Sequence, residues 1–438
     1  MHAASNDTAS PTALARRLVR EGRAREAEAV IVTLVADAFD LDVRGVGINA
    51  DWTSLNSLNG RVTVADGSRY FFKFHQEEGE EGTVREYYRA EVLHRAGLPV
   101  DMPSMVSRRP GHQILLYDLR DDPSLAELCL GIEGGHGSEE VEVAELAALQ
   151  RRLDRKTTQV YLETLHRPEP ERSAAEVIHQ LFHHRLVTPP DTARLGGRAL
   201  RFYEASTFHA GDEALSWQRL SGLRWRINGA DYRHTLAGLF AESLEVLRPD
   251  RLAAGASVTA HGDAHNGNIW VEGRDGSRRL VLFDPAFAGD EVPALLADVK
   301  ATFHNVFAHP HWLYHPTLAQ ARRRVGARVE GDTLILDHDW TLTPLREALL
   351  ASKIEEVWRP LLAALRQRGM LPRDWERILR CAMFCCPTLA LNLSPSPGEG
   401  GRSDAMSLLS LGIALMAGSF PAGGEEDVFT RFIAAVAP

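Results

Sequence analysis

The chain has 438 residues, with 49 Lys and Arg against 59 Asp and Glu, so the formal net charge is 49 − 59 = −10. Binding to nucleic-acid phosphates needs a basic surplus or a basic face, and this balance argues against a general nucleic-acid-binding protein. Hydrophobic residues make up 44 % and charged residues 25 % of the chain, which is typical of a soluble globular protein of two or three domains.

Three further features predict the compartment and the lack of membrane association. The four cysteines lack the paired spacing of a disulfide framework, which indicates a reducing compartment. No signal-peptide pattern precedes the first amphipathic stretch. Residues 405–424 carry no Lys or Arg but include Ser, Gly and Pro, and we expect a buried helix there rather than a membrane span. The predicted location is therefore the cytoplasm, with no membrane partner.

The first 120 residues change from helical to strand-like periodicity. Residues 12–40 have helical spacing and precede the strand-like runs, so residues 1–43 are expected to form an N-terminal helical extension. The following residues, 44–120, are expected to form one small lobe with an antiparallel sheet. Its predicted elements are strands at 46–52, 61–64 and 70–74, a helix at 83–96, and strands at 105–107 and 113–117.

Residues 121–438 have mainly helical apolar spacing, interrupted by one predicted hairpin with strands at 269–271 and 280–283. The predicted fold class is α+β, with a small antiparallel-sheet lobe and a large, mainly helical lobe. The predicted helices lie at 125–165, 174–186, 199–208, 231–247, 294–307, 316–325, 343–368, 372–391 and 404–416.

The hairpin is flanked by the most informative residues in the chain. Asp263 lies in the segment His261-Gly262-Asp263, Asn268 follows five residues later, and Asp284 follows the return strand. A loop, a hairpin and a second loop would bring these three oxygen-bearing side chains together. Mg²⁺ prefers such oxygen ligands and usually shares them with substrate phosphates, which leaves one carboxylate to act as a base.

These residues resemble the catalytic segments of the aminoglycoside phosphotransferase and choline kinase family, small-molecule relatives of the protein kinases. The resemblance implies a two-lobed protein-kinase-like fold that binds a nucleotide and Mg²⁺ between the lobes. It further implies that Asp263 orients and deprotonates an acceptor hydroxyl, while Asn268 and Asp284 hold Mg²⁺ against the nucleotide phosphates. The donor would be ATP, although the sequence does not distinguish ATP from GTP.

Each of these residues also has a purely structural interpretation. Asp263 would cap a turn, Asn268 would form an Asx-turn and Asp284 would begin a loop. For His261, bracing of the loop by a hydrogen bond is favoured over proton transfer. His265 is left open between the substrate and solvent.

In the small lobe, Lys73 is the only Lys between residues 1 and 155 and lies in an otherwise aromatic strand. By resemblance to the kinases, it would contact nucleotide phosphates and pair with a helix carboxylate. We expect that carboxylate to be Glu86, with Glu91 as the alternative. The structural interpretation of Lys73 is an edge-strand lysine that points into water.

Two further segments of the small lobe are assigned to the nucleotide. The turn at 53–60 has Ser and Asn where protein kinases have a glycine-rich loop, and it is either a phosphate-binding loop or an ordinary hairpin loop. Residues 116–119, including Tyr117 and Leu119, are expected to form the hinge whose backbone contacts the adenine edge.

Departures from protein kinases narrow the acceptor class. Asp284-Pro285-Ala286 replaces Asp-Phe-Gly, so the in/out switch of protein kinases is not expected, and no activation-segment signature is present. The predicted acceptor is therefore a small hydroxylated molecule. The segment 303–315 holds four His and four aromatic residues and is interpreted as acceptor-pocket lining, as a packed loop behind the metal segment, or as a zinc site.

The resulting prediction is a phosphotransferase that moves the γ-phosphoryl group of ATP to a hydroxyl of an aminoglycoside, sugar, aminosugar or related metabolite. Two alternatives stay open: a kinase-like protein that binds nucleotide without turnover, and a biosynthetic peptide or protein kinase. The sequence does not fix the oligomeric state.

Overall fold

The computed structural model describes residues 10–49, 57–75, 89–134, 139–273, 277–308, 310–398 and 400–438. The chain divides into two compact units. The first comprises Met1–Arg95, Pro99–Asp122 and Val281–Pro285, and the second comprises Ala96–Leu98, Pro123–Leu280 and Ala286–Pro438. One unit is built on a small antiparallel sheet and the other is mainly helical, so the predicted α+β fold class is confirmed.

The first unit contains a five-stranded sheet with the order β1-β2-β3-β5-β4, in which every neighbouring pair is antiparallel. The five strands expected from the sequence are all present, although β1 begins and ends earlier than predicted and β2 begins four residues earlier. Residues 89–95 are helical. The elements of this unit are α1 (Pro11–Arg20), α2 (Ala24–Phe39), β1 (Val43–Ile48), β2 (Ser57–Val64), β3 (Arg69–His75), β4 (Met105–Ser107) and β5 (Ile114–Asp118).

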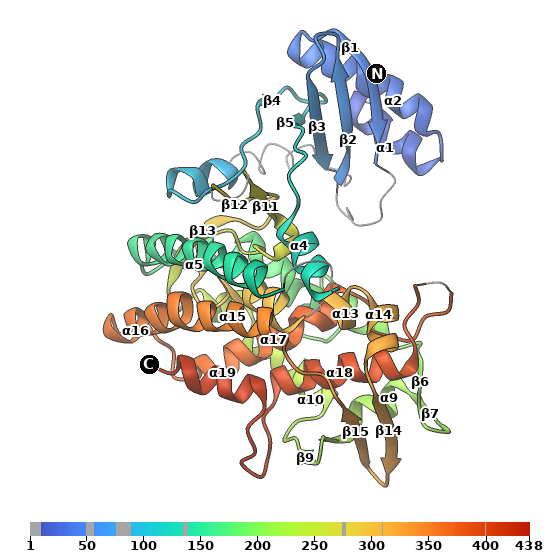
Figure 1. Ribbon diagram of the computed structural model, residues 1–438, viewed down its shortest axis with the longest axis vertical. Helices are drawn as coiled ribbons and strands as arrows, with labels where there is room; N and C mark the ends of the chain where they lie inside the picture. The colour runs from blue at the N-terminus through green and yellow to red at the C-terminus, as the bar shows by residue number, and fades with distance from the viewer. Residues whose placement is uncertain are drawn as a thin grey trace, which may run out of the picture. The chain divides into compact units, whose positions relative to one another are not determined.

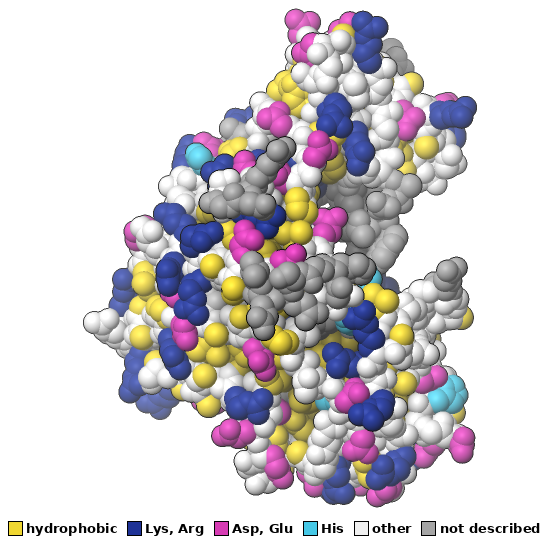
Figure 2. All heavy atoms as spheres, viewed as in Figure 1, with side chains coloured by type: hydrophobic (Ala, Val, Ile, Leu, Met, Phe, Trp, Pro, Cys, Tyr) yellow, Lys and Arg dark blue, Asp and Glu magenta, His cyan; other side chains and the backbone are white. Residues whose placement is uncertain are grey.

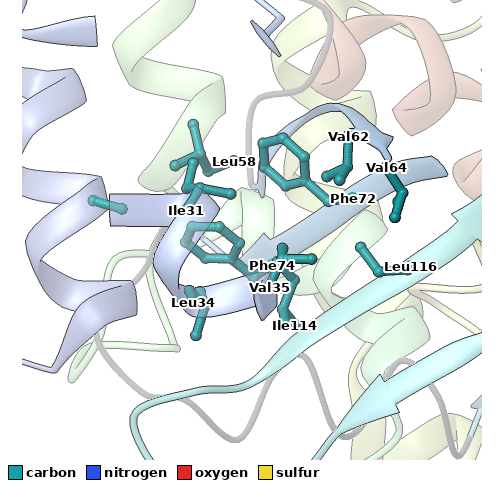
Figure 3. Packing of buried hydrophobic residues seen from close by; sticks show 11 residues of the cluster. Ile31, Leu34, Val35, Leu58, Val62, Val64, Phe72, Phe74, Ile114 and Leu116 are labelled. Carbon is teal, nitrogen blue, oxygen red and sulfur yellow. The ribbon is translucent and has the colours of Figure 1, made fainter. Parts of the chain in front are cut away.

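Helices α1 and α2 lie beside the strands of this sheet (Figure 1). Ala27, Ile31, Leu34 and Val35 of α2 are buried, and their spacing places them on one helix face. That face contributes to a core shared with the sheet residues, including Phe72 (Figure 3). The segment expected as a separate extension at residues 1–43 therefore supplies apolar cover for the sheet.

A short segment from far along the chain completes the first unit. Leu282 forms a parallel bridge with Val100, its N–H donates to the Pro99 carbonyl at 2.8 Å, and its carbonyl accepts from the Asp101 N–H at 2.7 Å. These backbone bonds fix residues 281–285 in the first unit, and Asp284 is among them.

The second unit has a mainly helical core. The segment at 405–424, expected as a buried helix, forms α18, which is buried along nearly its whole length. The elements of this unit are α4 (Leu125–Glu133), α5 (Glu139–Thr164), α6 (Pro170–Ala174), η1 (Val177–Leu181), α7 (His183–Leu186), α8 (Gly197–Tyr203), β6 (Thr207–Ala210), β7 (Glu213–Ser216), α9 (Trp217–Gly222), β8 (Arg224–Ile227), β9 (Ala230–Asp231), α10 (Leu236–Val246), α11 (Pro249–Leu252), β10 (Ser257–Ala260), η2 (Asn266–Asn268), β11 (Ile269–Glu272), β13 (Gly289–Pro293), α12 (Val299–Thr302), η3 (Phe303–Phe307), α13 (Pro310–Leu313), α14 (Pro316–Arg322), β14 (Val325–Glu330), β15 (Thr333–His338), α15 (Pro344–Ser352), η4 (Lys353–Trp358), α16 (Arg359–Gln367), α17 (Trp375–Ala390), α18 (Asp404–Gly418) and α19 (Val428–Val436). Strand β12 (Arg279–Leu282) begins in the second unit, and its last two residues belong to the first.

A four-stranded sheet with the order β14-β15-β8-β9 was not predicted from the sequence. Strands β14 and β15 form a hairpin, and β15 pairs in parallel with β8, more than 100 residues earlier in the chain. Period-two alternation over six residues is a weak signal beside long helical segments, and a pairing so distant in sequence leaves no local trace. The predicted helices left residues 326–342 unassigned, and the structure places most of β14 and all of β15 there.

Among the described residues, no helix combines the length and apolar character needed to cross a membrane. On the face shown in Figure 2, basic and acidic side chains are interspersed.

Gly60 tests the close packing of the first sheet. A Cβ atom at Gly60 would lie 2.1 Å from the Gly47 carbonyl oxygen and 2.6 Å from the Phe72 ring. We expect Gly60→Ala to lower the free energy of unfolding by about 1–3 kcal/mol, because the ring and the neighbouring strand must move. Gly47→Ala is the matched control, since nothing lies within 4 Å of a Cβ there, and its effect should stay within about 0.5 kcal/mol. Urea unfolding measures both, and equal effects would contradict the packing.

Candidate active site

The segment predicted to be catalytic begins directly after a buried strand. Strand β10 pairs with β13 in the second unit, and the loop that follows contains Gly262 with φ of 77°. A Cβ at Gly262 would lie 2.6 Å from the Phe287 carbonyl oxygen and 2.7 Å from the Ile178 side chain. Both the left-handed backbone and the close approach require glycine here. The turn at Gly262 thus sets the position of Asp263.

Side chains of the loop itself hold its conformation. The Asp263 N–H donates to His261 Nδ1 at 3.3 Å, which supports the interpretation of His261 as a brace. His265 precedes η2, and its Nδ1 accepts from the Gly267 N–H at 3.1 Å. The Asn268 Nδ2 donates to the Asp263 backbone carbonyl at 2.9 Å. The five-residue step from Asp263 to Asn268 is therefore closed by a direct hydrogen bond.

The Asp263 carboxylate is positioned by its loop, but not all of its hydrogen-bond acceptor sites are used. Its side chain is 13 % exposed, and within the described part of the chain its Oδ1 atom has no hydrogen-bond partner. Lys300 Nζ lies 3.8 Å from that oxygen, beyond hydrogen-bond distance. Because Oδ1 is buried beside Lys300, a donor from outside the chain, such as a hydroxyl group, would reach the carboxylate through the exposed part of the side chain.

Lys300 is the first residue in a series of polar side-chain contacts. Its Nζ lies 2.9 Å from His304 Nε2, and His304 Nδ1 contacts the Tyr314 hydroxyl. Burial, reinforced by the charge of Lys300, holds the pKa of His304 well below its usual value, so the ring is neutral near pH 7. With Lys300 donating to Nε2, the ring proton lies on Nδ1 and is directed at the tyrosine oxygen.

The catalytic loop rests on a second buried network. The Asn266 N–H donates to Asn305 Oδ1 at 2.6 Å, and Asn305 Nδ2 donates to the Ala264 carbonyl at 3.3 Å. Arg346 donates to the Asn305 carbonyl at 2.6 Å and forms a bidentate ion pair with Glu133, in which both side chains are 2 % exposed. Asn305 thus connects the loop to a fully buried charge pair.

These contacts bear on the three interpretations of the segment 303–315. Asn305 and His304 lie behind the catalytic loop, in agreement with the packed-loop interpretation, while the Lys300–His304 contact also connects the segment to Asp263. Among the described residues, no three His, Cys, Asp or Glu side chains lie together as a metal-binding group. The zinc interpretation therefore gains no support from the described residues.

In the first unit, Lys73 and Asp284 are in direct contact. Lys73 lies on β3, and its Nζ donates to Asp284 Oδ1 at 2.7 Å. The Lys73 side chain is 12 % exposed, so the interpretation as an edge-strand lysine in water is wrong. The sequence assigned these residues to a phosphate and to a metal ion, and the structure places them together.

Asp284 also has an unusual backbone. Its φ of 54° is in the left-handed region, which few residues other than glycine adopt without strain. The carboxylate of Asp284 and the amide of Asn268 are oxygen donors of the kind that Mg²⁺ prefers. Because the Asn268 amide nitrogen is bonded to the Asp263 carbonyl, its oxygen points away from that contact. The donor chemistry of both residues therefore fits Mg²⁺.

The remaining predicted nucleotide residues are only partly described. Glu86 and residues 53–56 lie outside the described residues, and Ser57–Gly60 belong to strand β2. Glu91, the alternative to Glu86, pairs with Arg95 on its own helix. Tyr117 lies on strand β5, between β3 and β4, and the Leu119 N–H donates to the Arg69 carbonyl at 3.0 Å. The Leu119 donor expected to face adenine is therefore used within the first unit.

A buried charge triad lies beside the segment that follows Asp284. Lys353 Nζ lies 2.8 Å from Asp154 and 3.0 Å from Asp298, and all three side chains are at most 3 % exposed. Burial alone would lower the pKa of Lys353, but the two carboxylates raise it above its usual value. Thr302 donates to Asp298 at 2.9 Å and accepts from Trp358 Nε1 at 2.8 Å. This network holds α5, α12 and η4 together.

Lys300 was missed by the sequence reasoning. It is an isolated cation in an apolar run, the same signal that drew attention to Lys73. Asn305 was named within the segment 303–315 but was given no role, because its contact with a loop 39 residues earlier leaves no sequence signal.

A pocket elsewhere in the second unit contains none of the predicted site residues. It is lined by apolar groups and by Arg251 and Asp374, which form an ion pair. We base the candidate site on the loop chemistry rather than on this pocket.

No family model matches the chain, and no curated protein matches its sequence. Three solved structures illustrate what it is similar to. Spectinomycin phosphotransferase, solved with ADP and spectinomycin, has 11 % identity and a TM-score of 0.36, covering 89 % of this chain and 98 % of that one. A microcompartment-associated aminopropanol kinase has 14 % identity and a TM-score of 0.39, with 89 % and 95 % covered.

The third is an aminoglycoside phosphotransferase from Streptomyces rimosus, with 14 % identity and a TM-score of 0.34, covering 76 % of this chain and 97 % of that one. Its name is that of the family which the catalytic-loop motif resembles. Because the TM-scores are all below 0.4, the functional argument rests on this chain's own residues.

Lys353 provides a test of the buried triad. We expect Lys353→Met to lower the free energy of unfolding by about 3–5 kcal/mol, because two carboxylates stay buried without their cation. Lys156→Met on α5 is the control, since Lys156 is partly exposed and bonds only to Gln159 among the contacts described. Its effect should stay within about 0.5 kcal/mol. Denaturant unfolding measures both, and a Lys353→Met protein as stable as the control would refute the role of the triad.

Proposed function

We propose that this protein is a kinase of small molecules, which transfers the γ-phosphoryl group of ATP to an alcohol of its acceptor. The observation that carries the proposal is the Asp263 carboxylate, which is held by a closed loop and keeps an oxygen without a hydrogen-bond partner among the described residues. A general base must also have an oxygen that the acceptor can reach, and the 13 % exposure of the Asp263 side chain meets that requirement.

In the proposed reaction, Asp263 aligns the acceptor hydroxyl and accepts its proton. The acceptor oxygen forms a bond to the γ-phosphorus, and the bond from that phosphorus to the bridging oxygen breaks and leaves ADP. Proton transfer alone contributes modestly, so most of the rate would come from alignment and from neutralisation of phosphate charge. The loop hydrogen bonds around Asp263 support this interpretation, because they fix the base before the acceptor binds.

Lys73, Asp284 and Asn268 are assigned to the nucleotide phosphates. Mg²⁺, when bound, supplies charge neutralisation at these phosphates, and Asn268 and Asp284 would hold it. Lys73 keeps the Asp284 carboxylate in place through the 2.7 Å contact and provides a second positive charge. Glu86 and the backbone near Tyr117 and Leu119 stay proposed nucleotide contacts.

The proposed acceptor is a hydroxylated small molecule, such as an aminoglycoside, a sugar, an aminosugar or a related metabolite. The proposed donor is ATP, and GTP is the alternative to be compared with it.

Two substitutions separate the base from the metal ligand. We expect Asp263→Asn to reduce phosphoryl transfer at least 100-fold while leaving Mg²⁺–nucleotide affinity within about twofold, because the amide cannot accept the proton. Asp284→Asn should weaken Mg²⁺-dependent nucleotide binding itself, because a charged ligand is lost. Titration calorimetry with Mg²⁺–ATP and Mg²⁺–GTP measures the affinity, and a phosphate-transfer assay over hydroxylated acceptors measures turnover.

Asp212→Asn is the control, since Asp212 is exposed in the turn between β6 and β7. Full transfer by the Asp263→Asn protein would remove the proposed base. Nucleotide binding without turnover on any acceptor would favour the nucleotide-binding protein, and an absence of binding would refute the assignment of the nucleotide site.

A further inference from the structure

Three cationic side chains from separate helices of the second unit interact electrostatically with one another, and two of them, Arg185 and Lys300, also interact with Asp263. Arg185 lies on α7, Arg198 on α8 and Lys300 on α12. Helix α7 packs against α8, and both α8 and α12 pack against α17. Lys300 Nζ is 3.8 Å from the Asp263 carboxylate, and the charge of Asp263 also acts on Arg185. We call these three residues the cationic cluster.

Arg185 is the least satisfied member of the cationic cluster. Its side chain is partly buried, and among the described residues its guanidinium has neither a hydrogen-bond partner nor a carboxylate within ion-pair distance. Two other buried cations of this unit are paired with carboxylates: Arg346 contacts Glu133 with two nitrogens, and Lys353 contacts two carboxylates. A partly buried guanidinium without a partner is costly to the fold and is normally retained for a ligand.

Only one nitrogen of the Arg198 guanidinium has hydrogen-bond acceptors among the described residues. Its Nη1 donates to the carbonyls of Leu389 and Ala390 at 3.0 and 3.4 Å. Within the described part of the chain, its Nε and Nη2 atoms have no acceptor. A guanidinium that is anchored through one nitrogen can offer the remaining two to a carboxylate or a phosphate in a fork geometry.

The local charge balance favours an anion. Burial lowers the pKa of Arg185 to about 10, and the charge of Arg198 acts in the same direction. Burial also lowers the pKa of Lys300, while Asp263 opposes that change. Cys386 does not compensate, because burial raises the pKa of its thiol to about 12 and keeps it neutral. Arg185 and Lys300 therefore share one carboxylate, and the charge of Arg198 makes the charged form of both less favourable.

We propose that the cationic cluster binds an anionic group, a carboxylate or a phosphate, carried by the acceptor molecule. This inference rests on the proposed function, because it assigns the substrate class of the site around Asp263. It favours hydroxy acids, sugar acids and phosphorylated alcohols. It disfavours polycationic aminoglycosides, since their ammonium groups would meet Arg185, Arg198 and Lys300.

The acceptor is not the only anion at the proposed site, because the γ-phosphate of the nucleotide is also negatively charged. The cationic cluster would bind either group. The two alternatives predict that the Arg185→Gln protein loses different binding properties. If the cluster binds the acceptor, Arg185→Gln weakens the binding of a free oxyanion and leaves the affinity for the nucleotide unchanged. If the cluster binds the γ-phosphate, Arg185→Gln reduces the preference for a non-hydrolysable ATP analogue over ADP.

The experiment uses inorganic sulfate as the probe and the full chain throughout. Equilibrium dialysis at constant ionic strength measures radiolabelled sulfate binding with and without Mg²⁺–ADP, and calorimetry measures Mg²⁺–ADP and the Mg²⁺-bound ATP analogue. The control is Arg201→Gln, which removes the same charge from an exposed position on α8. Circular dichroism establishes that each variant is folded.

We expect sulfate to bind the wild-type protein, with an affinity that falls at least tenfold in Arg185→Gln and stays within twofold in Arg201→Gln. The preference for the ATP analogue over ADP should be the same in all three proteins. The proposal is overturned if sulfate does not bind, if both variants lose it equally, or if Arg185→Gln removes the preference for the ATP analogue. Failure of the proposed function is a separate result, since it appears as absent nucleotide binding while sulfate binding is still measured.

Discussion

The hydrogen bond from the Asn268 amide to the Asp263 carbonyl is the contact on which the candidate site depends. It closes a loop that has no other regular structure than the short η2 helix, and it orients two functional groups at once. The Asp263 carboxylate is directed away from its own backbone, and the Asn268 oxygen is directed away from the bonded nitrogen. One contact therefore links the backbone of the proposed base to the side chain of the proposed metal ligand, so replacing Asn268 removes the contact whereas replacing the Asp263 side chain does not.

One buried ion pair supports this loop from behind, and a second buried charge group holds together α5, α12 and η4 of the same unit. Arg346 joins Glu133 to the Asn305 carbonyl, and Lys353 joins Asp154 to Asp298. Such pairs are weak evidence for stability, because the cost of removing charges from water offsets most of their attraction. They do impose geometry, since a displaced partner would leave a charge buried alone. We infer that they fix the position of the loop rather than increase the overall stability.

The sequence predicted most of the secondary structure and the chemistry of the loop, because both leave local signals. Asp263, Asn268 and Asp284 were identified from residue type and spacing within 22 positions. The sheet that joins β15 to β8, and the contact of Asn305 with the catalytic loop, could not be predicted in this way. Each depends on residues far apart in the chain, whose meeting is decided by packing of the whole unit. The site-residue roles remain predictions.

The charge of the whole chain and the charge of its site point in opposite directions. A net charge of −10 would by itself favour a cationic acceptor. Exposed acidic residues are screened by solvent and salt within about 10 Å, so they contribute little inside a buried site. Asp263 interacts instead with Arg185 and Lys300, whose burial reduces that screening. The selectivity of such a site is therefore decided by the few charges that the fold withdraws from water.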